Sequence, residues 1–306
     1  IMKKIVFFSM TMLMIFTQNC EYQGQSGSSV APVSSSVEQE TKNSTVNSNF
    51  PSELKVLSYN ILCSDCFYYK GLVQNWKHRR SFVFKIIRDR DPDLIGLQEV
   101  GAEQYQEIVR EFSTTYEIYA KDEKLMMRDV ILYRKSRFTL HNKGIADLPD
   151  LGDSSTEKLG LHQIWVTLSD KGSGTGKQFT FINTHFNAVS EEARVQSAEI
   201  IVSEAKSRKL RFDQETILVG DLNASPQSRP IQLLKEIFED TLCYSRSKTC
   251  DQPTFINFRS KLDYVFATGG VKSKGNSFID GGKIVNYVQP LLVPLKNGTF
   301  IAHKIK

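Results

Sequence analysis

From residue 54 onward, short apolar runs alternate with longer stretches in which apolar residues follow helical spacing. This pattern predicts helices over 75–90, 103–112 and 190–209, the last with a start signal at Ser190 followed by two glutamates. The apolar segments between them predict strands within 54–62, 94–100, 129–140, 161–170, 177–186, 215–224 and 260–268. Many short strands with a few long helices indicate an α+β domain whose sheets are covered by helices.

The first fifty residues lack this pattern and are interpreted as an export signal followed by a tether. Two lysines precede the apolar run 5–16, which is short for a membrane span and typical of a signal-peptide core. The run leads to Cys20, as in bacterial lipoprotein signals, although a hydrophobic N-terminal core strand is an alternative. Residues 21–50 are rich in Ser, Thr, Gln and Asn and are expected to be flexible. We therefore expect a signal in 1–20, a tether in 21–50, a folded domain in 51–306, and an exported protein that is membrane-anchored or secreted.

Composition and cysteine spacing limit the class of protein and the chemistry of its cysteines. The hydrophobic fraction of 40% excludes a disordered chain, and the net charge of +5 suits a polyanionic substrate without requiring one. Beyond the signal, four cysteines form two local pairs, Cys63 with Cys66 and Cys243 with Cys250. An exported domain permits two disulfides, and a zinc site or free thiols are the alternatives.

Polar side chains recur where the predicted apolar strands end. Residues two apart on an extended chain share a face, so Asp221 and Asn223 should point the same way. A buried carboxylate costs several kcal/mol unless a cation or hydrogen bonds compensate, which favours a hard cation or histidines as a shared partner. Taken singly, each residue has an ordinary structural explanation, such as an ion pair of Asp263 with Lys261 or Arg259. The strand-end residues are Asn60, Glu99, His185, Asp221, Asn223 and Asp263.

The order of these segments carries a family resemblance. "LSYNIL", "DLIGLQEV", "INTHF", "VGDLNASP" and "KLDYVF" follow one another across residues 54–306. The series resembles the endonuclease/exonuclease/phosphatase superfamily, the deoxyribonuclease-I-like fold. The resemblance implies a four-layer α+β sandwich of two packed mixed β-sheets flanked by helices. It also implies a Mg²⁺-dependent hydrolase, with Mn²⁺ as a substitute, acting on phosphoester bonds in nucleic acids, phospholipids, inositol phosphates or nucleotide conjugates.

The resemblance also implies roles for individual residues. Glu99 matches the principal Mg²⁺ ligand, with Asn60 beside it, and His185 matches the histidine that contacts the scissile phosphate. Asp221 matches the carboxylate that positions the attacking water, and Asn223 the amide that holds a phosphate oxygen. An in-line attack on a phosphoester needs such a cation, a base for water and donors to the phosphate oxygens.

The final motif departs from the family pattern. Asp263 matches the acid that orients a last histidine as general base, and His303 stands in that histidine's place. The aspartate usual before this histidine is replaced by Ala302. The first hypothesis is an exported phosphodiesterase or nuclease, with a sphingomyelinase-type phospholipid phosphodiesterase as an alternative. The others are an impaired relative that binds nucleic acid or phospholipid without turnover, and a purely structural surface lipoprotein. The expected partner is a nucleic acid or phospholipid substrate, with the protein itself a monomer.

Overall fold

The computed structural model describes one compact unit, which lies within Thr45–Lys306. The residues that it describes are 53–64, 75–121, 127–150, 161–241, 254 and 260–269, together with the strand segments 278–279, 282–288, 293–294 and 300–301. The predicted signal, the tether, Ala302 and His303 lie outside the described residues, as do Cys66, Cys243 and Cys250. Cys63 is disulfide-bonded. No helix among the described residues is long and apolar enough to cross a membrane.

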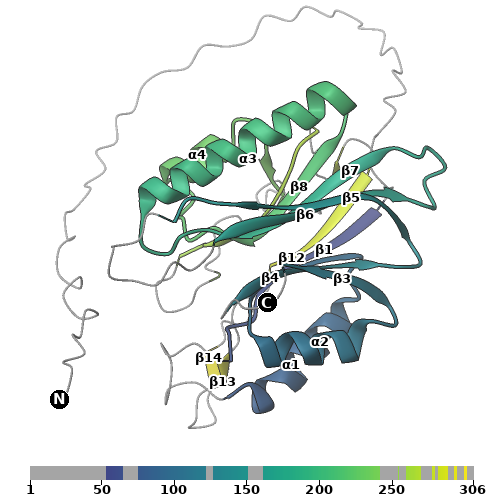
Figure 1. Cartoon of the computed structure of the whole chain (residues 1–306), viewed down its shortest axis with the longest axis vertical. Helices are drawn as coiled ribbons and strands as arrows, with labels where there is room; N and C mark the ends of the chain where they lie inside the picture. The colour runs from purple at the N-terminus through teal and green to yellow at the C-terminus, as the bar shows by residue number, and fades with distance from the viewer. Residues whose placement is uncertain are drawn as a thin grey trace, which may run out of the picture. The chain divides into compact units, whose positions relative to one another are not determined.

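Two six-stranded mixed sheets form the two inner layers of the domain (Figure 1). The first sheet has the order β11-β12-β1-β2-β4-β3 and the second β5-β6-β7-β8-β10-β9. The first contains β1 (Glu53–Asn60), β2 (Leu94–Val100), β3 (Tyr116–Ala120), β4 (Arg128–Arg134), β11 (Phe278–Ile279) and β12 (Gly282–Val288). The second contains β5 (Phe138–Asp147), β6 (His162–Asp170), β7 (Gln178–His185), β8 (Glu215–Asp221), β9 (Glu239–Asp240) and β10 (Asp263–Ala267). A separate ribbon pairs β13 (Val293–Pro294) with β14 (Phe300–Ile301).

Helices cover the outer face of each sheet, which confirms the predicted four-layer sandwich (Figure 1). The first sheet carries α1 (Trp76–Arg90) and α2 (Ala102–Phe112), and the second carries α3 (Glu191–Phe212) and α4 (Arg229–Leu234). Capping explains where the long helices begin: the side chain of Asn75 accepts a hydrogen bond from His78 N, and that of Ser190 accepts one from Ala193 N.

The inner faces of the two sheets enclose the central core. In β8, Ile217 and Val219 point inward, while Leu218 packs toward the helices. The same period of two continues to the end of the strand, so Asp221 occupies an inward position after two apolar ones. The same alternation occurs in β10, where Val265 points inward and Asp263, two residues away, occupies an inward position at the end of the strand. The inner surface is therefore apolar along most of its length and becomes polar at one end of the sandwich.

Candidate active site

The polar end of the sandwich brings the predicted site residues together. Strand pairing places His185 opposite Asp221, and Asp221 opposite Asp263. Asn60 spans the two sheets: its Nδ2 donates to Glu99 Oε1 at 2.9 Å and to Asp221 Oδ2 at 3.1 Å. Residues from β1, β2, β7, β8 and β10 thus share one site, as the strand-end pattern predicts.

Backbone strain accompanies this convergence. The pairing of β2 with β4 shifts register between Leu97 and Val100, and Glu99 within the shift has a φ of 56°. Two more non-glycine residues beside the site, Leu62 and Asn223, have φ values of 57° and 45°. A bulge turns a side chain away from the strict alternation of a strand, and positive φ is costly for such residues. The bulge therefore explains how Glu99 reaches a site that regular alternation from the inward Leu94 would deny it.

Two buried side chains from the helices hold the loop that follows β1. Arg79 in α1 donates to Ile61 O at 2.6 Å and to Leu62 O at 2.8 Å. Gln104 in α2 donates to Leu62 O at 3.0 Å and accepts from Gly101 N at 2.8 Å. Burial lowers the pKa of Arg79 to about 10. These contacts tie the end of β1 to the end of β2 and so fix Asn60 relative to Glu99.

Close packing of acidic groups shifts their protonation. The pKa of Asp263 is raised well above its usual value by burial and then by the charges of Asp221 and Glu99, against a hydrogen bond from Thr254. Its Oδ1 is buried and has no hydrogen-bond partner among the residues described. The ion pair with Lys261, an alternative for Asp263, is not formed: Lys261 Nζ instead lies 2.5 Å from Asp240 Oδ2.

His185 and Asn223 form a polar pair beside these carboxylates. Asn223 Nδ2 lies 2.9 Å from both Phe186 O and His185 Nε2. Because Phe186 O can only accept, the amide nitrogen must face both atoms, and Nε2 of the neutral ring is then the acceptor. Burial lowers the pKa of His185, but the neighbouring carboxylates, Asp221 first, outweigh this effect and leave the pKa raised.

A buried polar layer, which the strand-end argument does not detect, lies next to the site. Gln98 Nε2 donates to Asn183 Oδ1 at 2.7 Å, and Asn183 Nδ2 donates to Leu97 O and Val130 O at 2.9 and 3.0 Å. These bonds join the two sheets. Gly96 makes the close approach possible, since a Cβ there would lie 2.7 Å from Asn183 Oδ1. Asn183 stands two residues before His185, so period-two alternation from the histidine is the signal that could have found it.

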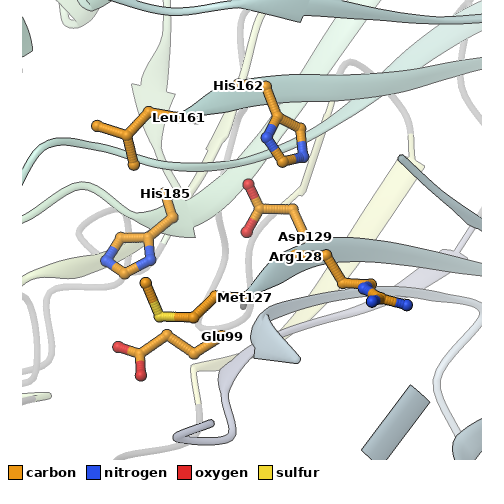
Figure 2. A pocket seen from close by; sticks show the side chains of 7 residues that line it. All are labelled: Glu99, Met127, Arg128, Asp129, Leu161, His162 and His185. Atoms are coloured by element: carbon orange, nitrogen blue, oxygen red, sulfur yellow. The ribbon is translucent and has the colours of Figure 1, made fainter. Parts of the chain in front are cut away.

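Asp129 and His162 are also site residues that the sequence argument missed. They line a pocket of about 20 Å³ together with Glu99, Met127, Arg128, Leu161 and His185 (Figure 2). Burial raises the pKa of Asp129 to about 6; His162 and His185 oppose the shift, while Glu99 and Asp221 add to it. Asp129 is the second residue of β4 and His162 the first residue of β6, at the edge where the neighbouring antiparallel strands end.

The carboxylates of the site suit a divalent cation that water and substrate help to coordinate, rather than one enclosed by protein ligands alone. Among the described residues, no three His, Cys, Asp or Glu side chains converge closely enough to enclose a metal ion. Mg²⁺ is commonly held by one or two carboxylates, with water and substrate phosphates completing its shell. The crowded carboxylates, and the buried Oδ1 of Asp263 without a described partner, supply the hard oxygen donors and negative charge that such an ion favours.

Comparison with known proteins adds sequence relatives. The chain is 27% identical over 199 residues to Protein angel of Drosophila melanogaster, covering 60% of this chain and 56% of that protein. It is 26% identical over 165 residues to the CCR4-Not complex 3'-5'-exoribonuclease subunit Ccr4 of Emericella nidulans, covering 44% of this chain and 24% of that protein. The chain thus spans about half the length of the first relative and a quarter of the second.

Solved structures share the fold at low identity. A mannosyl-6-phosphatase of Bacteroides thetaiotaomicron superposes with a TM-score of 0.60 at 22% identity, over 72% of this chain and 86% of that one. The human Nocturnin catalytic domain superposes with a TM-score of 0.55 at 20% identity, over 69% and 81%. Residues 57–278, more than half of the chain, match the profile described as Endonuclease/Exonuclease/phosphatase family. The chain belongs to this family of phosphoester hydrolases.

Proposed function

We propose that this protein is a Mg²⁺-dependent phosphoester hydrolase of the phosphodiesterase or nuclease type. The observation that carries the proposal is the contact of Asn60 with both Glu99 and Asp221, which joins the two sheets at the polar end of the sandwich. The His185–Asn223 pair adjoins the same carboxylates. A cation site, a carboxylate for water and donors to phosphate oxygens are the parts that hydrolysis of a phosphoester requires.

In this proposal Glu99, with Asn60 beside it, would hold the ion. When bound, Mg²⁺ would neutralise the charge that develops on the phosphate oxygens. Mn²⁺ would serve in its place. Glu99 suits this role because its carboxylate is only partly buried and its position is fixed: Oε1 accepts from Asn60 Nδ2 and Oε2 accepts from Cys63 N at 3.4 Å.

The remaining groups would orient water and phosphate. Asp221 is held on both oxygens: Oδ1 accepts from Asn223 N at 3.0 Å, and Oδ2 accepts from Asn60 Nδ2. A carboxylate fixed in this way can accept a hydrogen bond from an attacking water. A phosphate oxygen between His185 and Asn223 would replace His185 Nε2 as the acceptor of the amide hydrogen, and the raised pKa of His185 favours an imidazolium that donates to the same phosphate. Asp263 would act with His303, which stays a prediction.

Substrate and location complete the proposal. The curated relatives include an exoribonuclease subunit, and one similar structure is a sugar phosphatase, so RNA and sugar phosphates join DNA and phospholipids as substrates to test. Export, with or without a lipid on Cys20, and a monomeric state are part of the same proposal.

The test measures the full chain on RNA, plasmid DNA, sphingomyelin, mannose 6-phosphate and bis(p-nitrophenyl) phosphate, with Mg²⁺, Mn²⁺ or EDTA. We expect metal-dependent hydrolysis of at least one substrate, and a loss of about 100-fold or more in His185→Ala. In Glu99→Gln the stabilisation of the fold by Mg²⁺ against heat should also fall, because an ion that binds only the folded state raises its stability. Asp147→Asn, on an exposed side chain, is the matched control. No hydrolysis of any substrate with either metal would refute the proposal.

A further inference from the structure

Asp129 presents a buried carboxylate to the pocket that adjoins the proposed catalytic groups. The residue is only 4% exposed, and its side chain lines the pocket. In Figure 2 the carboxylate points into the pocket between His162 and His185, and Glu99 lines the opposite side. A carboxylate that faces a pocket from so buried a residue can accept a hydrogen bond from a group bound there.

The chemistry of the pocket limits what that group can be. A phosphate oxygen is disfavoured next to Asp129, because the two negative charges would repel each other. The cation of the proposed function is assigned to Glu99, which lines the side of the pocket opposite Asp129. An apolar group would leave the carboxylate without a hydrogen-bond donor. A neutral donor, either water or a hydroxyl group of the substrate, suits the carboxylate best.

The size of the pocket is compatible with one such group. A volume of about 20 Å³ accommodates about one water-sized group. Met127 and Leu161 form apolar walls, and the imidazole of His162 provides a second polar contact (Figure 2). The pocket shares His185 and Glu99 with the proposed catalytic site, so its occupant must be close to the scissile phosphate.

We propose that Asp129, assisted by His162, binds a hydroxyl group on the carbon next to the esterified carbon of the substrate. The protein then selects phosphate esters with a neighbouring hydroxyl, such as ribonucleotide 3'-esters and glycerol 2-phosphate, over esters that lack it. The hydroxyl donates to the Asp129 carboxylate. This inference rests on the proposed function, because it assigns the substrate class of the same site.

The test compares matched substrates that differ in this hydroxyl. For diesters the pair is the dinucleotide ApA and its deoxy form; for monoesters it is glycerol 2-phosphate and isopropyl phosphate. A hydrogen bond to a charged group corresponds to about a tenfold to hundredfold preference in kcat/KM for the hydroxylated member. Asp129→Asn should reduce that preference, and Asp129→Ala should abolish it. Asp147→Asn, on an exposed side chain, should keep the wild-type ratio.

A binding measurement decides the inference without turnover. In protein labelled with ¹³C-histidine, the His162 ring signals, assigned with His162→Gln, should move with adenosine 3'-phosphate and stay in place with its 2'-deoxy form. Equal movement, or none with either ligand, overturns the inference. So does a preference for the hydroxylated substrate that survives Asp129→Ala unchanged, or its absence in wild type. Whichever of these outcomes is found, hydrolysis of bis(p-nitrophenyl) phosphate shows separately whether the proposed function still holds.

Discussion

Replacement of Asp129 by asparagine should stabilise the folded protein at neutral pH. Burial raises the pKa of this carboxyl from its ordinary 3.8 to about 6, because the charged form loses its hydration. The charges of His162 and His185 favour the carboxylate and limit the shift, whereas Glu99 and Asp221 increase it. Asparagine has nearly the same shape and carries no charge, so it removes the unfavourable term and keeps the packing.

The sign follows from proton linkage. Below about pH 4 the carboxyl is protonated in both folded and unfolded states, and its burial costs little. As the pH rises toward 6 the unfolded chain releases its proton first, so the folded state loses stability relative to the unfolded state. Above pH 7 the accumulated penalty is about 3 kcal/mol, since one pKa unit corresponds to about 1.4 kcal/mol. That is a substantial share of the roughly 5–15 kcal/mol that stabilises a typical domain.

Urea denaturation between pH 4 and pH 8, in EDTA, measures this term. Asp129→Asn should unfold at higher urea concentration than wild type at pH 7.5, and the difference should shrink toward zero near pH 4. Asp147→Asn, on an exposed side chain, should show no comparable gain. A gain of equal size at both pH values, or a loss at pH 7.5, would refute the reasoning, because neither can come from a buried carboxylate that loses its proton.

Three further substitutions test the packing around the site, each by urea denaturation. Gly96→Ala places a Cβ 2.4 Å from Val219 Cγ2 and should lower the free energy of unfolding by about 1–3 kcal/mol. Val219→Ala in the same chain should restore part of this loss, and fully additive effects of the two substitutions would contradict the contact. Arg79→Met removes the donors to two loop carbonyls and should lower the free energy of unfolding by about 3 kcal/mol. An unchanged urea midpoint would contradict the role of Arg79 in holding the loop that follows β1. Lys261→Met removes the ammonium group 2.5 Å from the buried Asp240 carboxylate and should lower the free energy of unfolding by about 3–5 kcal/mol. A second change, Asp240→Leu, should recover most of this loss if it is electrostatic.

Local sequence signals predicted most of the described helices and strands. The apolar run 94–100 coincides with β2 because Pro92 and Gly101 flank it, and Ser190 caps α3 as expected. β3 was not predicted: it has only five residues, lies at the edge of its sheet and buries little beyond Tyr116. β12 was missed for another reason. It pairs with β1 across more than two hundred residues, and such a partnership has no local signal.

The site was predictable where a polar residue ends an apolar strand, and not elsewhere. Asp129 and His162 stand at the beginning of their strands, so a search of strand ends passes over them. Because β4 pairs antiparallel with β2 and β6 with β7, the beginnings of β4 and β6 lie at the same edge of the sandwich. The bulge at Glu99 could not be predicted from the sequence either, because the register shift depends on the partner strand rather than on the residues around Glu99.

The stability effect of Asp129 also separates the two explanations for its presence. Replacing a residue that serves the fold lowers the stability of the protein, as expected for Lys261. Removing the charge of a residue that serves binding can instead raise the stability of the protein, because a binding site can be unfavourable for the fold until its ligand is present. Three non-glycine residues with positive φ and four carboxylates, Glu99, Asp129, Asp221 and Asp263, lie at this end of the sandwich. If Asp129→Asn raises stability and lowers selectivity together, the carboxylate serves the substrate; if it lowers both, Asp129 is structural and the proposed hydroxyl subsite falls with it.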